Sequence, residues 1–234
     1  MEQEVRLNKF LSEAGVCSRR EADRMVEKGR ILVDGVPAQM GQKVRASQKI
    51  EVDHKRIQIE EEKVLLAFNK PRGIVCTTSK KDKDNIVDYI NYGKRIYPIG
   101  RLDKDSEGLI LLTNQGELVD KILRGSNYHE KEYIVTVNKK ITPEFLRAMG
   151  SGVPILDTVT RPCELEQIGP RTFRIILTQG LNRQIRRMCE YFSYRVIELT
   201  RVRVMNIRLG RLKSGTYRKI VGKELEELVK LLEK

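Results

Sequence analysis

The residues best suited to chemistry in this sequence are the carboxylates of one glycine-bounded segment. Residues 99–109 read Ile-Gly-Arg-Leu-Asp-Lys-Asp-Ser-Glu-Gly-Leu and separate two strand-like stretches. Asp103 and Asp105 lie in the middle of it. A loop carboxylate can act as a nucleophile or a base, but an isolated loop aspartate is more often a solvated turn residue. The segment therefore supplies candidates that need support from other parts of the chain.

Positive charge is concentrated near the C-terminal end. The 234 residues include 45 Lys and Arg against 32 Asp and Glu, a formal net charge of +13. Residues 171–219, called the basic segment below, hold 13 Lys and Arg against Glu190 and Glu198, a surplus of +11. Localised basic side chains neutralise phosphates and release counterions, so we expect a nucleic-acid partner. A solvated face kept charged for solubility is the alternative.

Several function classes are disfavoured by composition. No uninterrupted apolar stretch approaches the ~18 residues of a membrane span, so we expect a soluble, cytoplasmic protein with no membrane partner. Two isolated histidines and four scattered cysteines lack the clustering of a metal site, and we expect reduced thiols, no metal and no cofactor. These residues are His54, His129, Cys17, Cys76, Cys163 and Cys189.

The N-terminal region, residues 1–62, predicts a small domain with a linker. Apolar residues at helical spacing from Leu7 predict a first helix, and Ser18 with Glu21 forms a capping box for a second. Asp34-Gly35 predicts a tight hairpin, and Glu60, Glu61 and Glu62 mark the linker. The second helix directs Arg19, Arg20 and Arg24 outward. A domain this small is better suited to presenting a surface than to enclosing a site.

Residues 63–234 predict a larger α+β domain with a mostly antiparallel sheet. Thr142 followed by Pro143 predicts the start of one helix. The other expected helices cover 86–90, 117–123, 181–191 and 223–232. The expected strands cover 64–68, 74–78, 109–113, 133–137, 171–178 and 196–209.

Four motifs occur in a fixed order within this larger domain. They are Asn69-Lys70-Pro71-Arg72-Gly73-Ile74, the segment around Asp103, Lys131-Glu132-Tyr133-Ile134-Val135, and Leu181-Asn182-Arg183-Gln184-Ile185-Arg186-Arg187-Met188. Together they resemble the motifs of RNA pseudouridine synthases. Residues 6–52 resemble the alpha-L RNA-binding domain, a pairing found in the branch that modifies ribosomal RNA at single sites.

The resemblance implies that a uridine is isomerised to pseudouridine without a cofactor. It implies that Asp103 is the catalytic carboxylate, that Tyr133 stacks on the uracil, and that Arg186 forms a salt bridge with Asp103. A guanidinium near a carboxylate in a closed pocket favours its ionised form. The remaining basic residues of the motifs would contact RNA or, for Lys70, support the catalytic sheet: Lys70, Arg101, Arg183 and Arg187. We expect a monomer that binds no DNA.

Two other functions are compatible with parts of the sequence. A non-catalytic RNA-binding or ribosome-assembly factor would explain the charge but not the ordered motifs. A glycoside hydrolase using Asp103 with Asp105 or Glu107 would cleave a similar bond, but it would not need the basic segment. The resemblance implies large-subunit (23S) ribosomal RNA as the substrate, with small-subunit ribosomal RNA or tRNA as alternatives.

Overall fold

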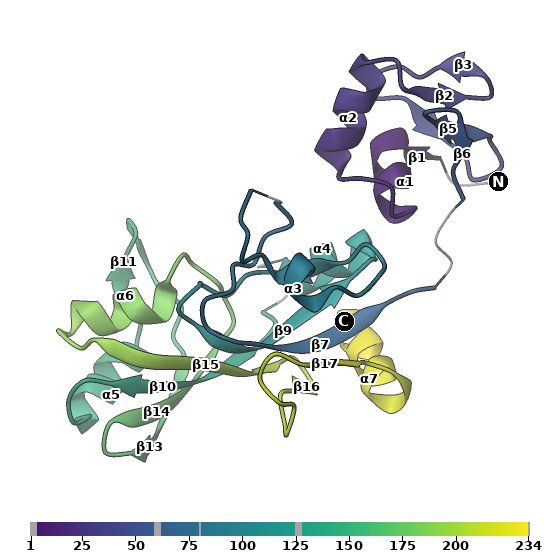
Figure 1. Cartoon of the computed structure of the whole chain (residues 1–234). Helices are drawn as coiled ribbons and strands as arrows, with labels where there is room; N and C mark the ends of the chain where they lie inside the picture. The colour runs from purple at the N-terminus through teal and green to yellow at the C-terminus, as the bar shows by residue number, and fades with distance from the viewer. Residues whose placement is uncertain (1–3, 59–61, 80, 125–127, 234) are drawn as a thin grey trace. The chain divides into compact units, whose positions relative to one another are not determined.

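The structure is a computed structural model that describes residues 4–58, 62–79, 81–124 and 128–233 (Figure 1). Its backbone contacts divide the chain into two compact units. The first consists of Met1–Val64 with the short segments Tyr92–Ile96 and Asn114–Gly116, and the second contains the remaining residues. The predicted linker residues Glu60 and Glu61 lie outside the described residues.

The N-terminal unit forms two helices and short antiparallel strands, as the sequence predicts. Helix α1 spans Leu7–Glu13 and α2 spans Arg19–Glu27, and the Ser18 hydroxyl accepts a hydrogen bond from the backbone N–H of Glu21. Asp34 and Gly35 both have positive φ and join two strands, which confirms the hairpin. One sheet has the order β3-β2-β5-β6 and a second pairs β1 with β4. The strands are β1 (Val5–Arg6), β2 (Ile31–Val33), β3 (Val36–Pro37), β4 (Lys43–Val44), β5 (Ile50–Val52) and β6 (Lys55–Arg56).

The second unit is built on a nine-stranded sheet with the order β13-β14-β10-β15-β9-β7-β17, to which β16 and β8 add through β15 and β9. The ladders described in this sheet are antiparallel except for β9 with β15, so the predicted α+β class is confirmed. The strands are β7 (Leu65–Lys70), β8 (Tyr97–Ile99), β9 (Glu107–Thr113), β10 (Lys131–Val137), β13 (Glu164–Gly169), β14 (Thr172–Leu177), β15 (Val196–Val204), β16 (Ile207–Arg208) and β17 (Tyr217–Lys219). A separate hairpin pairs β11 (Pro154–Ile155) with β12 (Thr158–Val159).

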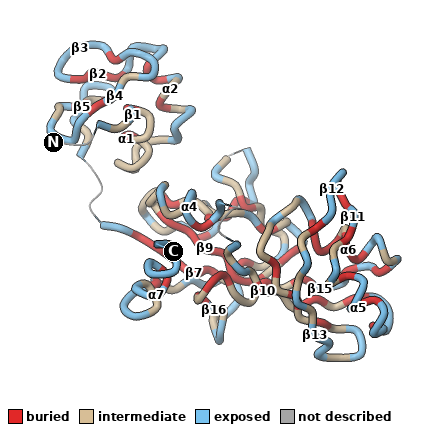
Figure 2. The backbone as a smooth tube through the Cα atoms, turned by 180° about the vertical axis from the view of Figure 1, so that it is seen from behind, coloured by how far each residue is buried: buried red, intermediate tan, exposed pale blue. Residues whose placement is uncertain are grey.

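Two apolar clusters support this sheet. One lies on β10, β14 and β15 beneath α5 (Pro143–Gly150) and α6 (Gln184–Tyr191), with the Phe145 ring packed against Phe173. The other joins β7 and β9 to α4 (Gly116–Leu123) and α7 (Gly222–Leu232). Strands β7 and β9 are buried along almost their whole length, as the red tube in Figure 2 shows. The short helix α3 (Ile86–Ile90) packs on β7, where Tyr89 meets Phe68.

Three predicted elements differ from the structure. Residues 74–78 form no strand; Val75 makes one isolated bridge to Asn85, and the Cys76 thiol accepts a hydrogen bond from the Leu102 N–H instead of extending a ladder. The expected strand 196–209 is broken, because Met205 adopts φ +52 and turns the chain between β15 and β16. The expected helix 181–191 begins only at Gln184, since Arg183 is in the left-handed region.

Candidate active site

The segment with the candidate carboxylates is a tight loop between β8 and β9. The N–H of Ser106 donates to the Asp103 carbonyl, which closes a turn, and the Ser106 side chain is buried. At the end of the loop Gly108 has φ +101, and a Cβ placed there would lie 2.3 Å from the backbone oxygen of Arg201. Only glycine allows the backbones of β9 and β15 to approach so closely. The loop is therefore fixed to the sheet at Gly108, directly after its carboxylates.

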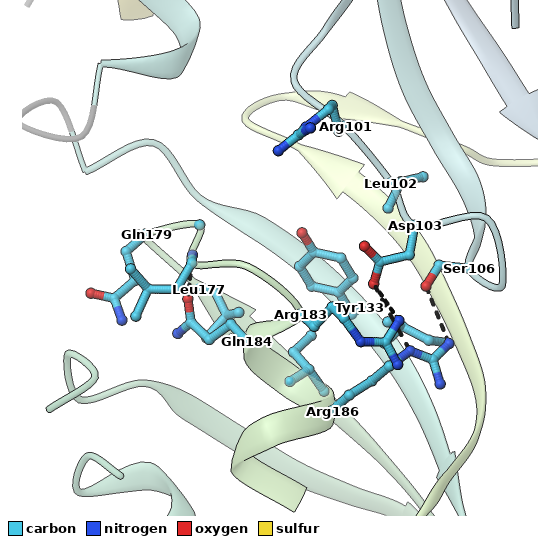
Figure 3. Close-up of a pocket in the computed structure, with 14 residues that line it drawn as sticks. Arg101, Leu102, Asp103, Ser106, Tyr133, Leu177, Gln179, Arg183, Gln184 and Arg186 are labelled. Carbon is cyan, nitrogen blue, oxygen red and sulfur yellow. Dashed lines mark hydrogen bonds and ion pairs between the residues drawn. The ribbon is translucent and has the colours of Figure 1, made fainter. Parts of the chain in front are cut away.

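A pocket opens above this loop (Figure 3). It is formed by the loop, by one face of β10, β14 and β15, and by the segment that leads into α6. Two of the four sequence motifs, those of the loop and of α6, meet at it directly, and a third contributes Tyr133. Its lining comprises Arg101, Leu102, Asp103, Ser106, Tyr133, Leu177, Gln179, Gly180, Leu181, Arg183, Gln184, Ile185, Arg186 and Leu199.

Within this pocket Asp103 faces two guanidinium groups. Nη1 of Arg183 lies 3.6 Å from Oδ2 of Asp103, and Nε of Arg186 lies 4.0 Å from the same oxygen. The Asp103 side chain is 34% exposed, so its carboxylate can be reached from the open side. Figure 3 shows the carboxylate pointing toward both arginines. The two guanidinium groups attract the carboxylate and orient it within the pocket.

Arg186 is anchored so that its guanidinium has one free donor near Asp103. Its Nη2 donates to the Asp105 carbonyl at 3.2 Å and to the Ser106 hydroxyl at 3.3 Å, while its buried Nε has no hydrogen-bond partner. Burial, and next the charge of Arg183, lower the pKa of Arg186, but a guanidinium remains charged. A small shift of Asp103 toward Nε would turn the 4.0 Å contact into a hydrogen bond.

Arg183 takes a backbone conformation that is unusual for its type. It is the N-cap of α6 with φ 51 and ψ 34, in the left-handed region, and its side chain makes no capping hydrogen bond. Such a conformation costs on the order of 1 kcal/mol for a residue other than glycine or asparagine. Strain of this kind collects at functional sites, and here it turns the exposed Arg183 side chain toward Asp103.

Tyr133 lies on the pocket side of the sheet. It is the third residue of β10, its register partners are Ile175 on β14 and Arg201 on β15, and it packs at the edge of the apolar cluster under α6. Its ring is half-buried and lines the same pocket as the Asp103 carboxylate (Figure 3). The structure thus brings together Asp103, Tyr133 and Arg186.

The interpretation of Lys70 as an RNA contact is wrong. Its side chain is fully buried, and Nζ donates to the carbonyls of Pro71 at 2.8 Å and Ile74 at 2.9 Å. The Lys104 carbonyl, in the loop that carries Asp103, lies 3.5 Å from Nζ of Lys70 and also accepts a hydrogen bond from the N–H of Gly73. Burial lowers the pKa of Lys70. The residue ties the turn after β7 to the loop, which is the supporting role considered as the alternative.

The other basic residues of the motifs are accessible. Arg101 is exposed at the pocket rim and points away from Asp103 (Figure 3). Arg187 is partly exposed and holds Asn182. In the N-terminal unit Arg19, Arg20 and Arg24 are exposed on α2, where Arg24 pairs with Glu21 at 3.0 Å. These positions leave the guanidinium groups available to a polyanion.

The basic segment is not a uniform charged surface. Arg186 and Arg201 are buried, and three further arginines are paired with glutamates: Arg174, Arg203 and Arg218. The exposed cations of the segment are Arg171, Arg183, Arg195, Arg208, Arg211, Lys213 and Lys219. Charge counted along the sequence therefore exceeds the charge offered to a partner.

The sequence did not predict the roles of several residues near the pocket. Ser106 positions Arg186, and its place inside the loop motif was the available signal. Lys131 and Arg201 lie beside Tyr133 on the same sheet face, which only the strand register reveals. Within the described part of the chain, no group of three His, Cys, Asp or Glu residues is arranged to hold a metal ion. No helix there has the length and apolar character needed to cross a membrane.

Comparison with known families gives this pocket a chemical context. Residues 64–191, more than half of the chain, match the RNA pseudouridylate synthase family. The chain belongs to this family. Residues 5–50 match the S4 domain. The protein is thus an RNA pseudouridine synthase, an isomerase, and the reading as a non-catalytic binding factor is set aside.

Curated relatives cover nearly the whole synthase. The chain is 55% identical over 231 residues to the dual-specificity RNA pseudouridine synthase RluF of Salmonella typhi, covering 98% of this chain and 80% of the relative. It is 35% identical over 232 residues to the ribosomal large subunit pseudouridine synthase B of Bacillus subtilis, covering 95% of each. A crystal structure titled pseudouridylate synthase matches with a TM-score of 0.70 and 26% identity, covering 97% of this chain and 99% of that one.

Proposed function

We propose that the synthase isomerises a uridine of ribosomal RNA, with Asp103 as its catalytic carboxylate. The observation that carries the assignment is the meeting of Asp103, Tyr133 and Arg186 at one pocket, with the carboxylate facing two guanidinium groups. The large-subunit substrate is supported by the Bacillus subtilis relative, which is named a ribosomal large subunit pseudouridine synthase. The RluF relatives are named dual-specificity enzymes, so we extend the proposal to a second RNA substrate, with tRNA as the candidate.

The proposed chemistry uses the arrangement of the pocket. The Asp103 carboxylate either attacks C1′ of the ribose or removes a proton from the sugar, and the bond between C1′ and N1 breaks with its electron pair moving to the uracil. The ring turns while it rests on Tyr133, and C5 bonds to C1′ as the ester bond between Asp103 and C1′ breaks or, on the other route, as Asp103 returns the sugar proton. The proton on C5 then leaves to solvent, and N1 gains a proton from solvent. Arg186 keeps Asp103 oriented throughout.

The target must leave its stack to reach this pocket. Extruding a nucleotide costs on the order of a few kcal/mol, which contacts in the pocket must offset. Arg101 at the rim is placed to fill the vacated space or bind a phosphate, and Arg183 and Arg187 flank the entrance from the start of α6. Residues 1–62 form the docking domain and residues 63–234 the catalytic domain in this proposal. The enzyme acts as a monomer in the cytoplasm.

The test compares RNA from cells with and without the gene. Pseudouridine is mapped at single-nucleotide resolution in ribosomal RNA and tRNA, and purified enzyme is then added to the unmodified RNA. Loss of one or more ribosomal sites in the deletion strain, restored by the enzyme, supports the proposal. An unchanged ribosomal map, with a change confined to tRNA, contradicts the ribosomal assignment while leaving the isomerase activity intact.

A further inference from the structure

Two cations lie next to the pocket floor, and neither forms an ion pair with a carboxylate among the residues that the structure describes. Tyr133, Leu177 and Leu199 form that floor on three adjacent strands. Lys131 is two residues before Tyr133 on β10 and directly opposite Leu177, while Arg201 is directly opposite Tyr133 and two residues after Leu199. Side chains two apart on a strand share a face, so both cations flank Tyr133.

Arg201 is deeply buried and incompletely hydrogen-bonded, and Lys131 lies half-buried on the same sheet face. Arg201 is 3% exposed; its Nε donates to the Leu109 carbonyl at 2.6 Å, but its buried Nη2 has no hydrogen-bond partner. The Lys131 Nζ donates to the His129 carbonyl at 3.3 Å. A buried cation without a partner is costly and needs an explanation. The sheet therefore retains positive charge at this position at the expense of stability.

The acidic groups nearby are directed elsewhere. Glu130 and Glu132 bind Arg203, which faces the other side of the sheet. Across from Lys131, β14 presents Leu177 and β15 presents Val204, and neither is charged. Cys76, on which the charge of Arg201 acts, has a pKa raised by burial and remains a neutral thiol. Burial, and next the charge of Arg201, lower the pKa of Lys131 to about 8.

We propose that Lys131 and Arg201 stabilise, through space, the negative charge that the uracil ring carries after its bond to C1′ is broken. The inference rests on the proposed function and deepens it. When that bond breaks, its electron pair passes to the ring, and N1, O2 and O4 share the charge until C5 bonds to C1′. A ring stacked on Tyr133 lies next to the sheet face that carries both cations. Fixed charge near developing charge is effective in a site that excludes water. Both residues act on the uracil ring through space.

The test uses single-turnover release of tritium from C5-labelled ribosomal RNA transcripts with saturating enzyme. Lys131→Met should slow the chemical step about tenfold at pH 7 and leave the Kd for RNA within twofold of wild type. Lys223→Met, at an exposed lysine on α7, serves as the matched control and should change neither quantity.

The pH profile separates charge from structure. In wild type the rate should fall above pH 8 as Lys131 loses its proton, and Lys131→Arg should move this fall to higher pH while keeping the rate at pH 7. If Lys131→Met does not fold, the Lys131→Arg profile alone decides. The proposal is overturned if the rate of Lys131→Arg falls at the same alkaline pH as that of wild type. It is also overturned if Lys131→Met keeps the wild-type rate but binds RNA more weakly and with a flatter salt dependence, which would indicate a phosphate contact. A wild-type enzyme that releases no tritium from ribosomal RNA would instead refute the proposed function.

Discussion

At the scale of single residues, the proposed function depends on one carboxylate that faces two guanidinium groups. Asp103 is reachable from the pocket, and Arg186 is fixed by the Asp105 carbonyl and the Ser106 hydroxyl. In this proposal the loop supplies both the reacting group and the acceptors that orient its partner. Substitutions in this loop and in Arg186 can therefore distinguish effects on the chemical step from effects on RNA binding.

Replacing Asp103 by Asn keeps the size of the side chain but removes its charge. Neither nucleophilic attack nor proton abstraction remains possible, so tritium release should fall below detection. RNA affinity, measured by filter binding in parallel, should change less than about threefold, because the phosphate contacts lie on other residues. A variant that still turns over near the wild-type rate would refute the assignment of Asp103.

Replacing Arg186 by Lys keeps a charge but loses the planar fork. The ammonium cannot hold the Ser106 hydroxyl and the Asp105 carbonyl while also facing Asp103. We expect kcat to drop about 10- to 100-fold with a much smaller change in Kd, measured by single-turnover kinetics and filter binding. Arg187→Lys, one position along the same helix, is the control. A larger effect on Kd than on kcat would instead make Arg186 an RNA contact.

Lys131 also predicts a pH dependence of stability. Its pKa falls from 10.5 to about 8 on folding. Between these pH values the unfolded chain holds a proton that the folded chain has released, so the contribution of this residue to stability rises as pH increases. The melting temperature of Lys131→Met should exceed that of wild type at pH 7, and the difference should shrink toward pH 10. A constant difference across this range would contradict the low pKa.

At the scale of elements, the sequence predicted helix caps and turns correctly, because these depend on contacts between residues close together in the chain. Ser18 and Thr142 cap α2 and α5 as predicted, each accepting a hydrogen bond from the N–H three residues later. Asp34-Gly35 forms the predicted hairpin because these two residue types adopt the positive φ values that a two-residue turn needs. The family resemblance implied that Arg186 lies beside Asp103, and the structure places the two groups 4.0 Å apart.

The predictions failed where a contact between residues far apart in the chain determines the local structure. Residues 74–78 look like a strand, yet the Cys76 thiol is held by the N–H of Leu102, 26 residues away. Lys70 lies in a motif rich in RNA-binding residue types, yet three carbonyls surround its ammonium. The shared face of Lys131 and Arg201 depends on a register shift in β15 that alternation in sequence does not show. Such features become predictable only once the register of the sheet is known.

The start of α6 gives a prediction at this scale. Arg183 occupies the left-handed region without capping the helix. Asn adopts this region more readily and can cap, so Arg183→Asn should raise the free energy of unfolding by about 0.5 to 1 kcal/mol in a urea titration. Activity should fall at the same time, since Asp103 loses a nearby cation. Arg187→Asn, in the helix proper, should not be stabilising; equal effects at both positions would exclude relief of strain at Arg183.

At the scale of the whole molecule, the charge available to RNA is smaller than the net charge of +13 implies, and it is divided between the two units. Part of the basic segment is paired or buried, whereas Arg19, Arg20 and Arg24 in the N-terminal unit are exposed. We therefore expect RNA affinity to depend on both units and the chemical step on the second.

The triple variant Arg19→Gln, Arg20→Gln, Arg24→Gln tests this division. Each lost phosphate contact should lower the slope of log K against log salt by roughly 0.7 to 0.9, so a total change near 2 is expected. Single-turnover rates at saturating enzyme should stay within twofold of wild type. An unaltered slope would mean that α2 does not touch the RNA backbone.

The parallel junction of β9 and β15 is a short seam in the large sheet. Its register comprises two residue pairs, Thr200 with Glu107 and Arg201 with Gly108, which join segments about 90 residues apart in the chain. The antiparallel ladders of β7 with β9 and of β10 with β14 comprise more pairs. The seam runs beside Asp103, and we expect it to open on heating before these longer ladders do. Catalysis should consequently be lost at a lower temperature than helical and strand content.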